Sequence, residues 1–186
     1  LEALSGGATS GALEVVRQKN PDLSEEAKQA VARAVGIGAI KYPMLARENG
    51  KIVTFDWETA LDFDGQAAPY IQYAYVRAGS ILRKAGGDLP ADLTPAYELS
   101  QAEIVLVDMI ARIPKEVQRA AADLKPLQIA TLGFELAQAF NDFYTQCPVL
   151  SAEPAVRDNR LRLVAAARQA IAVLLALMGI TAPEAM

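Results

Sequence analysis

The chain has 186 residues, of which 52% are hydrophobic and only 6% aromatic, and its formal net charge is −4. This length allows one well-formed core, and the shortage of aromatic residues favours helices over sheet. The acidic total excludes a surface that is basic overall, so an anionic partner would have to bind a local group of cations. The sequence contains no histidine, which removes the commonest general base and the Ser–His and Cys–His nucleophilic pairs.

The only thiol is Cys147. A single cysteine and no histidine leave no usual zinc site and no internal disulfide, and they suggest a reducing compartment. No apolar run reaches membrane-spanning length, and the first residues lack the pattern of a signal peptide. We therefore predict a cytoplasmic protein with no membrane contact, no metal site and no catalytic residues of its own.

The chain begins with a segment of poor helix-forming composition. Residues 5–11 read SGGATSG, which is typical of a linker, whereas Leu13 and Val16 could open a short helix. Because Leu1 is not methionine, we expect a fragment of a longer protein. We predict that residues 1–12 are a linker or a truncated helix, and that residues 13–186 form one helical domain.

A first clear helix start follows at Ser24, which can cap the helix before two glutamates. The apolar pattern then runs through residues 36–42, GIGAIKY, until Pro43 disturbs it. Gly36 and Gly38 each cost a helix roughly 1 kcal/mol relative to alanine. A close helix contact or a ligand requirement would offset that cost, and both explanations stay open.

The pair Asn49-Gly50 precedes a β-branched run and indicates a short turn, so we expect one small hairpin or extended excursion near residues 47–55. The acidic loop that follows carries Trp57 and Phe63. Such aromatic residues are more often anchors that hold a loop against a bundle than ligand contacts.

Pro69 stands where a first helical residue would, because proline's missing N–H costs nothing there. The helix it opens has an apolar stripe: Ile71, Ala74, Tyr75, Ala78, Ile81, Leu82 and Ala85. Another face holds an aromatic residue among cations and a serine, namely Tyr73, Arg77, Ser80 and Lys84. Gly86-Gly87 ends the helix.

The remaining sequence predicts four more helical segments. An amphipathic stretch surrounds residues 98–109, a short helix restarts at Pro114, a long helix spans residues 127–143, and the last helix runs from Pro154 to a glycine cap at Gly179. Connectors this short point to antiparallel neighbours. The predicted fold is all-α, an antiparallel helical bundle.

Four segments in chain order resemble arginyl-tRNA synthetases of the bacterial type: residues 36–42, residues 55–77 with Pro69-Tyr70-Ile71-Gln72-Tyr73, residues 140–150, and residues 177–186. An imperfect match to the Asp-Ala-Leu-Arg signature lies at residues 158–162. The resemblance implies the helical anticodon-binding domain of a class Ia synthetase, with residues 1–12 coming from its junction with the catalytic domain. It covers nearly the whole chain from about Leu13.

The resemblance also implies an activity that this chain could not perform alone. Such an enzyme is an arginine–tRNA ligase that uses ATP, with magnesium, in a catalytic domain marked by His-Ile-Gly-His and Lys-Met-Ser-Lys-Ser motifs, and neither motif is present here. The fragment is therefore expected to bind no cofactor and to be catalytically inactive. Its expected partners are the anticodon stem-loop of tRNA(Arg) and its own catalytic domain, and we expect a monomer.

By the same resemblance, seven residues are predicted to bind tRNA: Gly65, Gln66, Tyr70, Arg77, Asn141, Tyr144 and Met186. Unpaired bases can stack on such aromatic and apolar side chains, and nearby cations can meet phosphates. Two cationic groups are available, residues 77–84 and residues 157–168, and the first shares its helix with the loop at residues 62–67. The alternative is a helical protein–protein docking module without RNA binding.

Overall fold

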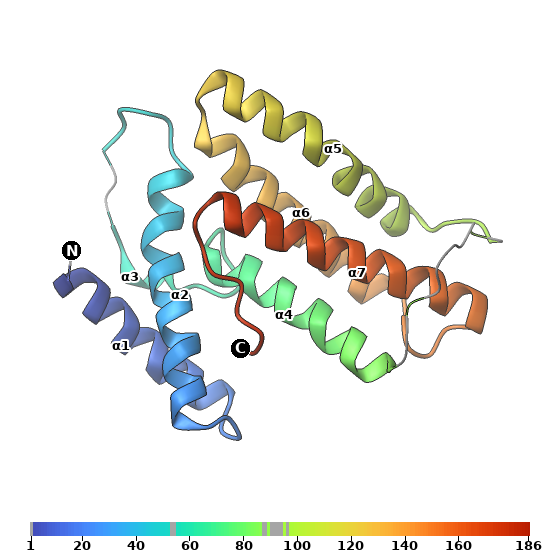
Figure 1. Ribbon diagram of the computed structural model, residues 1–186, viewed down its shortest axis with the longest axis horizontal. Coiled ribbons are helices and arrows are strands. Elements are labelled where there is room, and N and C mark those ends of the chain that lie inside the picture. Colours follow the sequence, from blue (N-terminus) through green and yellow to red (C-terminus); the bar gives the residue numbers. More distant parts are fainter. Residues whose placement is uncertain (1, 53–54, 87–88, 90–94, 96) are drawn as a thin grey trace.

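The structure, a computed structural model, describes residues 2–52, 55–86, 89, 95 and 97–186. Within these ranges every regular element is a helix, which confirms the predicted all-α fold (Figure 1). The helices are α1 (Glu2–Lys19), α2 (Glu25–Leu45), α3 (Trp57–Ala60), α4 (Ala68–Ala85), α5 (Gln101–Asp123), α6 (Pro126–Gln146) and α7 (Pro154–Leu177).

Helices α4 to α7 form a bundle, and α1 and α2 pair with each other at one end of it (Figure 1). The bundle encloses the main core, in which Ile71, Leu106, Leu136, Phe140 and Leu174 are fully buried. A smaller apolar cluster holds α1 and α2 together. Helix α4 is central to the arrangement because it contacts α2, α6 and α7.

The helix ends follow the local chemistry of the sequence. The hydroxyl of Ser24 accepts the amide of Ala27 at the start of α2, as predicted. Pro126 and Pro154 stand in the first turns of α6 and α7. Gly86 and Gly179 follow α4 and α7 with φ angles of +63° and +64°, where a side chain would be strained.

Of the two alternatives for residues 1–12, a linker or a truncated helix, the structure shows a helix, since the glycine-rich residues belong to α1. Ala8, Ala12 and Val16 recur at helical spacing and are buried against α2. The packing energy of this stripe outweighs the poor helix propensity of the glycines. Whether residues 1–12 form a junction with another domain stays a prediction.

Pro114 does not restart a helix, because α5 continues through it without a break. The side chain of Pro114 is exposed, while Met109, Ile113 and Ala120 on both sides of it are buried in the core. Water can therefore satisfy the carbonyl that loses its partner, and the buried contacts keep both halves in one helix.

The predicted hairpin near residues 47–55 is reduced to a turn, in which the amide of Lys51 donates to the carbonyl of Glu48 at 3.2 Å. No strand flanks it within the described part of this segment, and residues 53 and 54 lie outside the described residues. Without a third strand or a covering layer, a two-stranded piece would have little to stabilise it.

The two glycines of α2 are explained by close packing. A side chain on Gly36 would come within 2.9 Å of the backbone of Ala8 and Thr9 in α1. One on Gly38 would meet Ala68 at the start of α4 and Ile180 after α7. The glycines thus let α2 approach two neighbours at once, and the packing explanation holds for both.

Candidate functional site

A groove of about 550 Å³ runs along the exposed face of α4. It is walled by α4, by the end of α6 with the turn that follows, and by the last residue of the chain; we call it the α4 groove. Its lining residues are Tyr73, Val76, Arg77, Ser80, Ile81, Lys84, Tyr144, Pro148, Val149, Leu150, Ser151 and Met186. The lining combines aromatic and aliphatic side chains with the cations Arg77 and Lys84. Such a surface suits a planar, negatively charged ligand.

Arg77 is one of the two cations that line the groove among the residues that the structure describes. Its guanidinium carbon is 4.6 Å from the ring centroid of Tyr73 and 4.9 Å from that of Tyr144. Its Nη1 also donates a 2.8 Å hydrogen bond to Oδ1 of Asn141. Two rings and one amide therefore hold the guanidinium flat, so little further ordering is needed when a ligand binds.

The turn after α6 is fixed by a buried ion pair. Arg160, on α7, donates from Nε to Glu103 of α5 at 2.9 Å and from Nη1 to the carbonyl of Pro148 at 2.7 Å. Because Pro148 lines the groove, this arginine connects the wall of the α4 groove to the core. Arg160, which lies within the imperfect Asp-Ala-Leu-Arg match at residues 158–162, thus has a structural role.

Glu103 is only 1% exposed and accepts bonds from the hydroxyl of Tyr97 at 2.7 Å and the amide of Ser100 at 2.8 Å, besides Arg160. Burial alone would raise the pKa of Glu103, but the hydrogen bonds from Arg160 and Ser100 outweigh it and lower this pKa to about 2. Burial and the neighbouring carboxylate raise the pKa of Tyr97 to about 12. At neutral pH Glu103 is therefore ionised while Tyr97 keeps its proton, and the cluster acts as a rigid support.

Met186 reaches the groove from the segment after α7, residues 179–186, which we call the tail. The tail crosses from the end of α7 over α4 (Figure 1). Met186 is half-buried and packs against both apolar clusters while it lines the groove. Its sulfur and methyl offer a polarizable contact of the kind that adapts to a flat ring.

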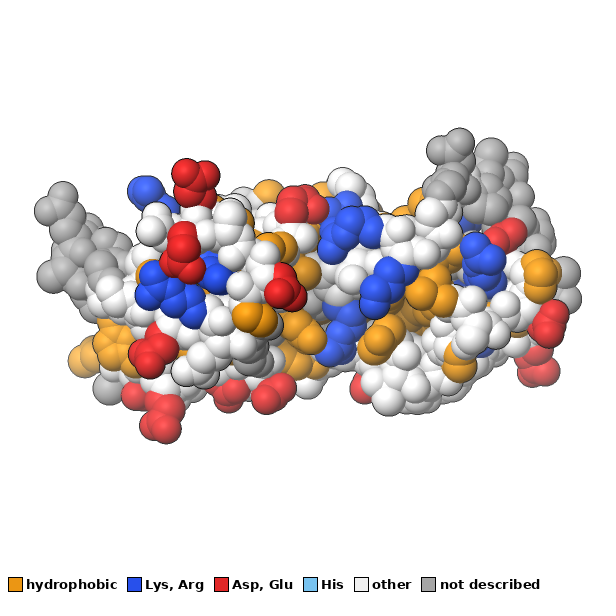
Figure 2. Space-filling view, turned by 90° about the horizontal axis from the view of Figure 1, so that it is seen from below, with side chains coloured by type: hydrophobic (Ala, Val, Ile, Leu, Met, Phe, Trp, Pro, Cys, Tyr) orange, Lys and Arg blue, Asp and Glu red, His pale blue; other side chains and the backbone are white. Residues whose placement is uncertain are grey.

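The cations at the groove belong to the first of the two predicted groups. Arg77 and Lys84 line the groove, and Arg83 and Lys84 are exposed at the end of α4. Figure 2 shows Lys and Arg side chains alternating with hydrophobic ones over the middle and right of this face. In the second group, Arg160 and Arg168 are paired with Glu103 and Glu184, which makes them less available to a ligand.

The structure thus brings together four of the seven predicted site residues: Arg77, Asn141, Tyr144 and Met186. Tyr70 lies one turn before Tyr73 on the same helix, and its ring packs on Phe134 at 5.2 Å between centroids. It is half-buried and does not line the groove.

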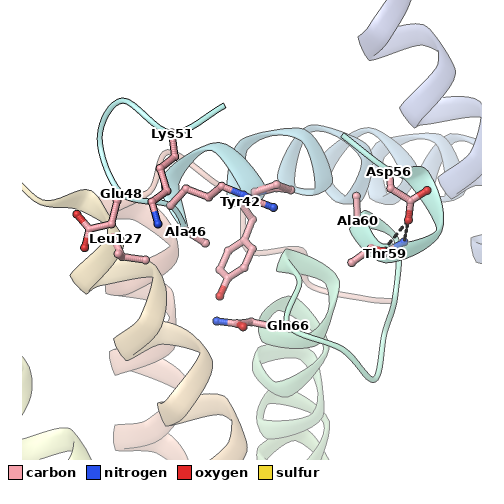
Figure 3. A pocket seen from close by; sticks show the side chains of 11 residues that line it. Tyr42, Ala46, Glu48, Lys51, Asp56, Thr59, Ala60, Gln66 and Leu127 are labelled. Atoms are coloured by element: carbon pink, nitrogen blue, oxygen red, sulfur yellow. Dashed lines mark hydrogen bonds between the residues drawn. The ribbon is translucent and has the colours of Figure 1, made fainter. Parts of the chain in front are cut away.

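Gly65 and Gln66 lie elsewhere, in the loop before α4. The loop is shaped by Asp62, whose carboxylate accepts the amide of Asp64 at 2.8 Å, and Gly65 leaves space for that carboxylate. Gln66 lines a separate pocket of about 520 Å³ between α2, α3 and the start of α6, where it faces the hydroxyl of Tyr42 (Figure 3). Burial raises the pKa of Tyr42 to about 12, so this hydroxyl stays protonated.

Several residues of the groove were absent from the predicted set: Tyr73, Ser80, Lys84, Val149 and Leu150. The first three had a usable signal, because they share one helical face with Arg77 at spacings of three to seven residues. For the turn at 148–151 the sequence carried no periodic signal, since its position depends on Arg160.

Within the described ranges, no group of three or more potential ligand side chains could hold a metal ion. Among the described helices, none is long and apolar enough to cross a membrane.

Comparison with known proteins identifies the domain type. Residues 71–186 match the DALR anticodon binding domain family. An arginine–tRNA ligase of Thermococcus sibiricus is 44% identical in a match 186 residues long. The match covers 96% of this chain and 29% of that protein. The Pyrococcus abyssi ligase is also 44% identical, over 182 residues with the same coverage. The chain therefore spans less than a third of the length of these relatives.

A solved structure agrees with the sequence matches. The arginyl-tRNA synthetase of Thermus thermophilus superposes with a TM-score of 0.92 at 34% identity, covering 100% of this chain and 32% of that one. The Plasmodium falciparum enzyme, at 20% identity and a TM-score of 0.82, shares the fold. The prediction of a bacterial type is not supported, because the Thermococcus sibiricus and Pyrococcus abyssi ligases, at 44% identity, are archaeal.

Proposed function

This chain belongs to the DALR anticodon binding domain family, and on that premise we propose that it recognises the anticodon loop of tRNA(Arg) as part of an arginine–tRNA ligase. The single observation that carries the proposal is the α4 groove. Four residues that were assigned to RNA from the sequence, far apart in the chain, line or adjoin one surface: Arg77, Asn141, Tyr144 and Met186.

The groove offers both parts of single-strand recognition. Tyr144 is 43% exposed, so part of this side chain is accessible to an unpaired base, and Met186 lines the same groove. Asn141 has a free amide side besides the oxygen that Arg77 uses, and it can read a base edge. Arg83 and Lys84 are placed for phosphates at the end of α4.

We propose that Gly65, Gln66 and Tyr70 form a second part of the interface, in which the loop before α4 shifts when RNA binds. Two features support this assignment. Gln66 is exposed at the mouth of its own pocket, and Tyr70 belongs to the same helix as Arg77. A movement of the loop would therefore pass directly to the α4 groove.

In this proposal the ligase reaction takes place in a catalytic domain outside these 186 residues, which would bind ATP and magnesium. Our sequence prediction of inactivity for the isolated chain belongs to the same proposal, as do a monomeric state and a cytoplasmic location. The single free thiol, Cys147, which is buried, agrees with a reducing compartment.

Titration of the chain with a labelled tRNA(Arg) anticodon stem-loop at several salt concentrations tests the proposal. The control has the same stem and a scrambled loop. We expect tighter binding of the native loop, with a logarithmic salt slope of about −2 if three cations meet phosphates of a single strand. Equal binding of both RNAs, or of neither, would contradict the proposal.

The second candidate, a docking module without RNA binding, is favoured by an exposed apolar patch where α5, α6 and α7 meet. Leu124 and Leu177 are 78% and 53% exposed there. Capture from lysate with and without nuclease separates the two functions. Partners held through RNA should be lost on nuclease treatment, whereas a partner docked on this patch should stay.

A further inference from the structure

The tail has no regular secondary structure after Ile180, whose amide still donates to the carbonyl of Leu175 at 2.9 Å. The side chain of Met186 nevertheless has a defined place at the α4 groove. Something other than backbone pairing must hold residues 181–186. The structure shows two polar attachments and one buried proline, Pro183, along these six residues.

The first attachment is Gln72, the polar residue in the Pro-Tyr-x-Gln-Tyr pattern for which the sequence suggested no task. It is 0% exposed. Its Nε2 donates to the carbonyl of Thr181 at 2.7 Å and to that of Ala34 in α2 at 3.2 Å. One amide therefore joins α2, α4 and the tail, which a glutamate could not do because it has no donors when ionised.

The second attachment is a closed cluster on Glu184. Arg168 of α7 donates from Nη2 to Glu184 and to the hydroxyl of Tyr75, both at 2.7 Å. That hydroxyl donates to the other carboxylate oxygen at 2.9 Å, and the guanidinium lies 4.4 Å from the Tyr75 ring centroid. Gly79 leaves the space through which Arg168 reaches across α4.

The exposed position of Glu184 shows that the cluster is not mainly a source of stability. The carboxylate side chain is 72% exposed, and pairs of that kind contribute little to folding. The geometry of this cluster matters more than its energy, because α4, α7 and the tail each supply one of its groups. Such a closed arrangement restricts where the tail can lie.

We propose that Gln72 and the Tyr75–Arg168–Glu184 cluster form a clamp on the tail, and that the clamp positions Met186 for the RNA ligand of the α4 groove. The RNA ligand in this proposal rests on the proposed function, whereas the attachment of the tail by the clamp does not depend on it. Gln72, Tyr75, Arg168 and Glu184 are positioning residues, since each acts on the ligand through Met186. With Met186 preset, binding would avoid the cost of ordering the tail.

The test uses Glu184→Ala, because an exposed side chain can be removed without loss of the fold. Its matched control is Glu135→Ala, which removes an exposed carboxylate from α6 and changes the net charge equally. Labelled methionine methyl groups in the RNA-free protein report how ordered Met186 is. The resonance of Met186 is the one that disappears in the Met186→Leu variant. We expect the Met186 methyl group to move more in Glu184→Ala than in wild type. In the Glu135→Ala control its motion should equal that of wild type.

Stem-loop titrations then measure the consequence for binding. We expect Glu184→Ala and Met186→Ala each to weaken binding about five- to tenfold, at the lower end of what one stacking contact is worth. The double variant should be no weaker than either single variant, because both remove the same contact. The clamp would be overturned if the affinity losses of the two single variants multiply in the double variant. It would also be overturned if the motion of the Met186 methyl group does not change in Glu184→Ala.

Two further variants separate positioning from direct contact. Gln72→Met removes both donors at similar volume and should reproduce the release of Met186. Arg168→Gln should weaken binding without changing the salt slope, whereas a slope reduced by about 0.7 would reveal a phosphate contact and overturn the positioning role. If wild type fails to prefer the native stem-loop, the proposed function and the RNA role of the clamp both fall, while the methyl resonances still decide whether the clamp holds the tail.

Discussion

Arg77 and Asn141 are joined by a 2.8 Å hydrogen bond between α4 and α6, although 64 residues separate them in the chain. The bond holds the guanidinium between the rings of Tyr73 and Tyr144. The guanidinium group of Arg77 is thus oriented in the groove before any ligand arrives. This relationship makes the site sensitive to the shape of residue 77 and not only to its charge.

Arg77→Lys keeps the charge but should weaken binding of the anticodon stem-loop about tenfold. An ammonium group cannot lie flat between two rings and also reach Asn141 in the same geometry. Titration at constant salt measures the loss, and Arg83→Lys on the exposed end of the same helix is the control. Equal affinities for the two lysine variants would show that Arg77 serves only as a charge.

Tyr144→Ala should weaken stem-loop binding by about 1–3 kcal/mol, the usual value of one stacked base. Tyr144→Phe should bind nearly as well as wild type, because it keeps the ring and its contact with Arg77. Because this side chain is 43% exposed, the midpoint of denaturant unfolding should change little in either variant. A phenylalanine variant as weak as the alanine variant would point to the hydroxyl instead.

Glu103→Gln should destabilise the fold at pH 7 by up to about 3 kcal/mol, the equivalent of its pKa shift. The folded pKa of Glu103 is lowered to about 2, so wild type has this stabilisation in full above the unfolded value and loses it as the pH falls toward 2. The variant should therefore lose less stability than wild type between about pH 5 and pH 2.

Urea unfolding at each pH measures both profiles for Glu103. Glu25→Gln is the control, because Arg17 lowers the pKa of Glu25 through an ion pair in which both side chains are more than half exposed, and such a pair contributes little to folding. Parallel pH profiles for wild type and Glu103→Gln would contradict the assignment of acid sensitivity to the buried pair.

Gly36→Ala should destabilise the protein by about 1–3 kcal/mol, because its methyl group would stand 2.9 Å from the backbone of α1, which cannot move aside as a side chain can. Gly7→Ala is the opposite case. A methyl group there meets only Trp57 at 3.6 Å, and alanine should add up to about 1 kcal/mol of helix propensity. Thermal unfolding of the two variants should shift in opposite directions, and equal shifts would exclude packing as the reason for Gly36.

The sequence determined the class of fold and most helix ends, because those depend on neighbouring residues. Ser24, Pro126 and Pro154 start helices by capping or by a preset φ angle, and Gly179 ends one in a left-handed conformation. The resemblance of short segments also indicated candidate residues for RNA binding.

Local preference is a poor guide where contacts from another element outweigh it. The glycine-rich start is helical because α2 covers Ala8 and Ala12, and Pro114 stays within a helix because Met109 and Ile113 are buried beside it. Neither effect can be read from a window of neighbouring residues.

Only the tertiary structure decided how the site is assembled. The pairing of α4 with α6 placed Arg77 against Asn141 and Tyr144, and Gln72 connected the tail to α2 and α4. Sequence patterns gave Gln72 no such task and left Tyr73 and Ser80 outside the predicted site. These arrangements depend on distances between residues that are far apart in the chain, which the buried core fixes and local chemistry does not.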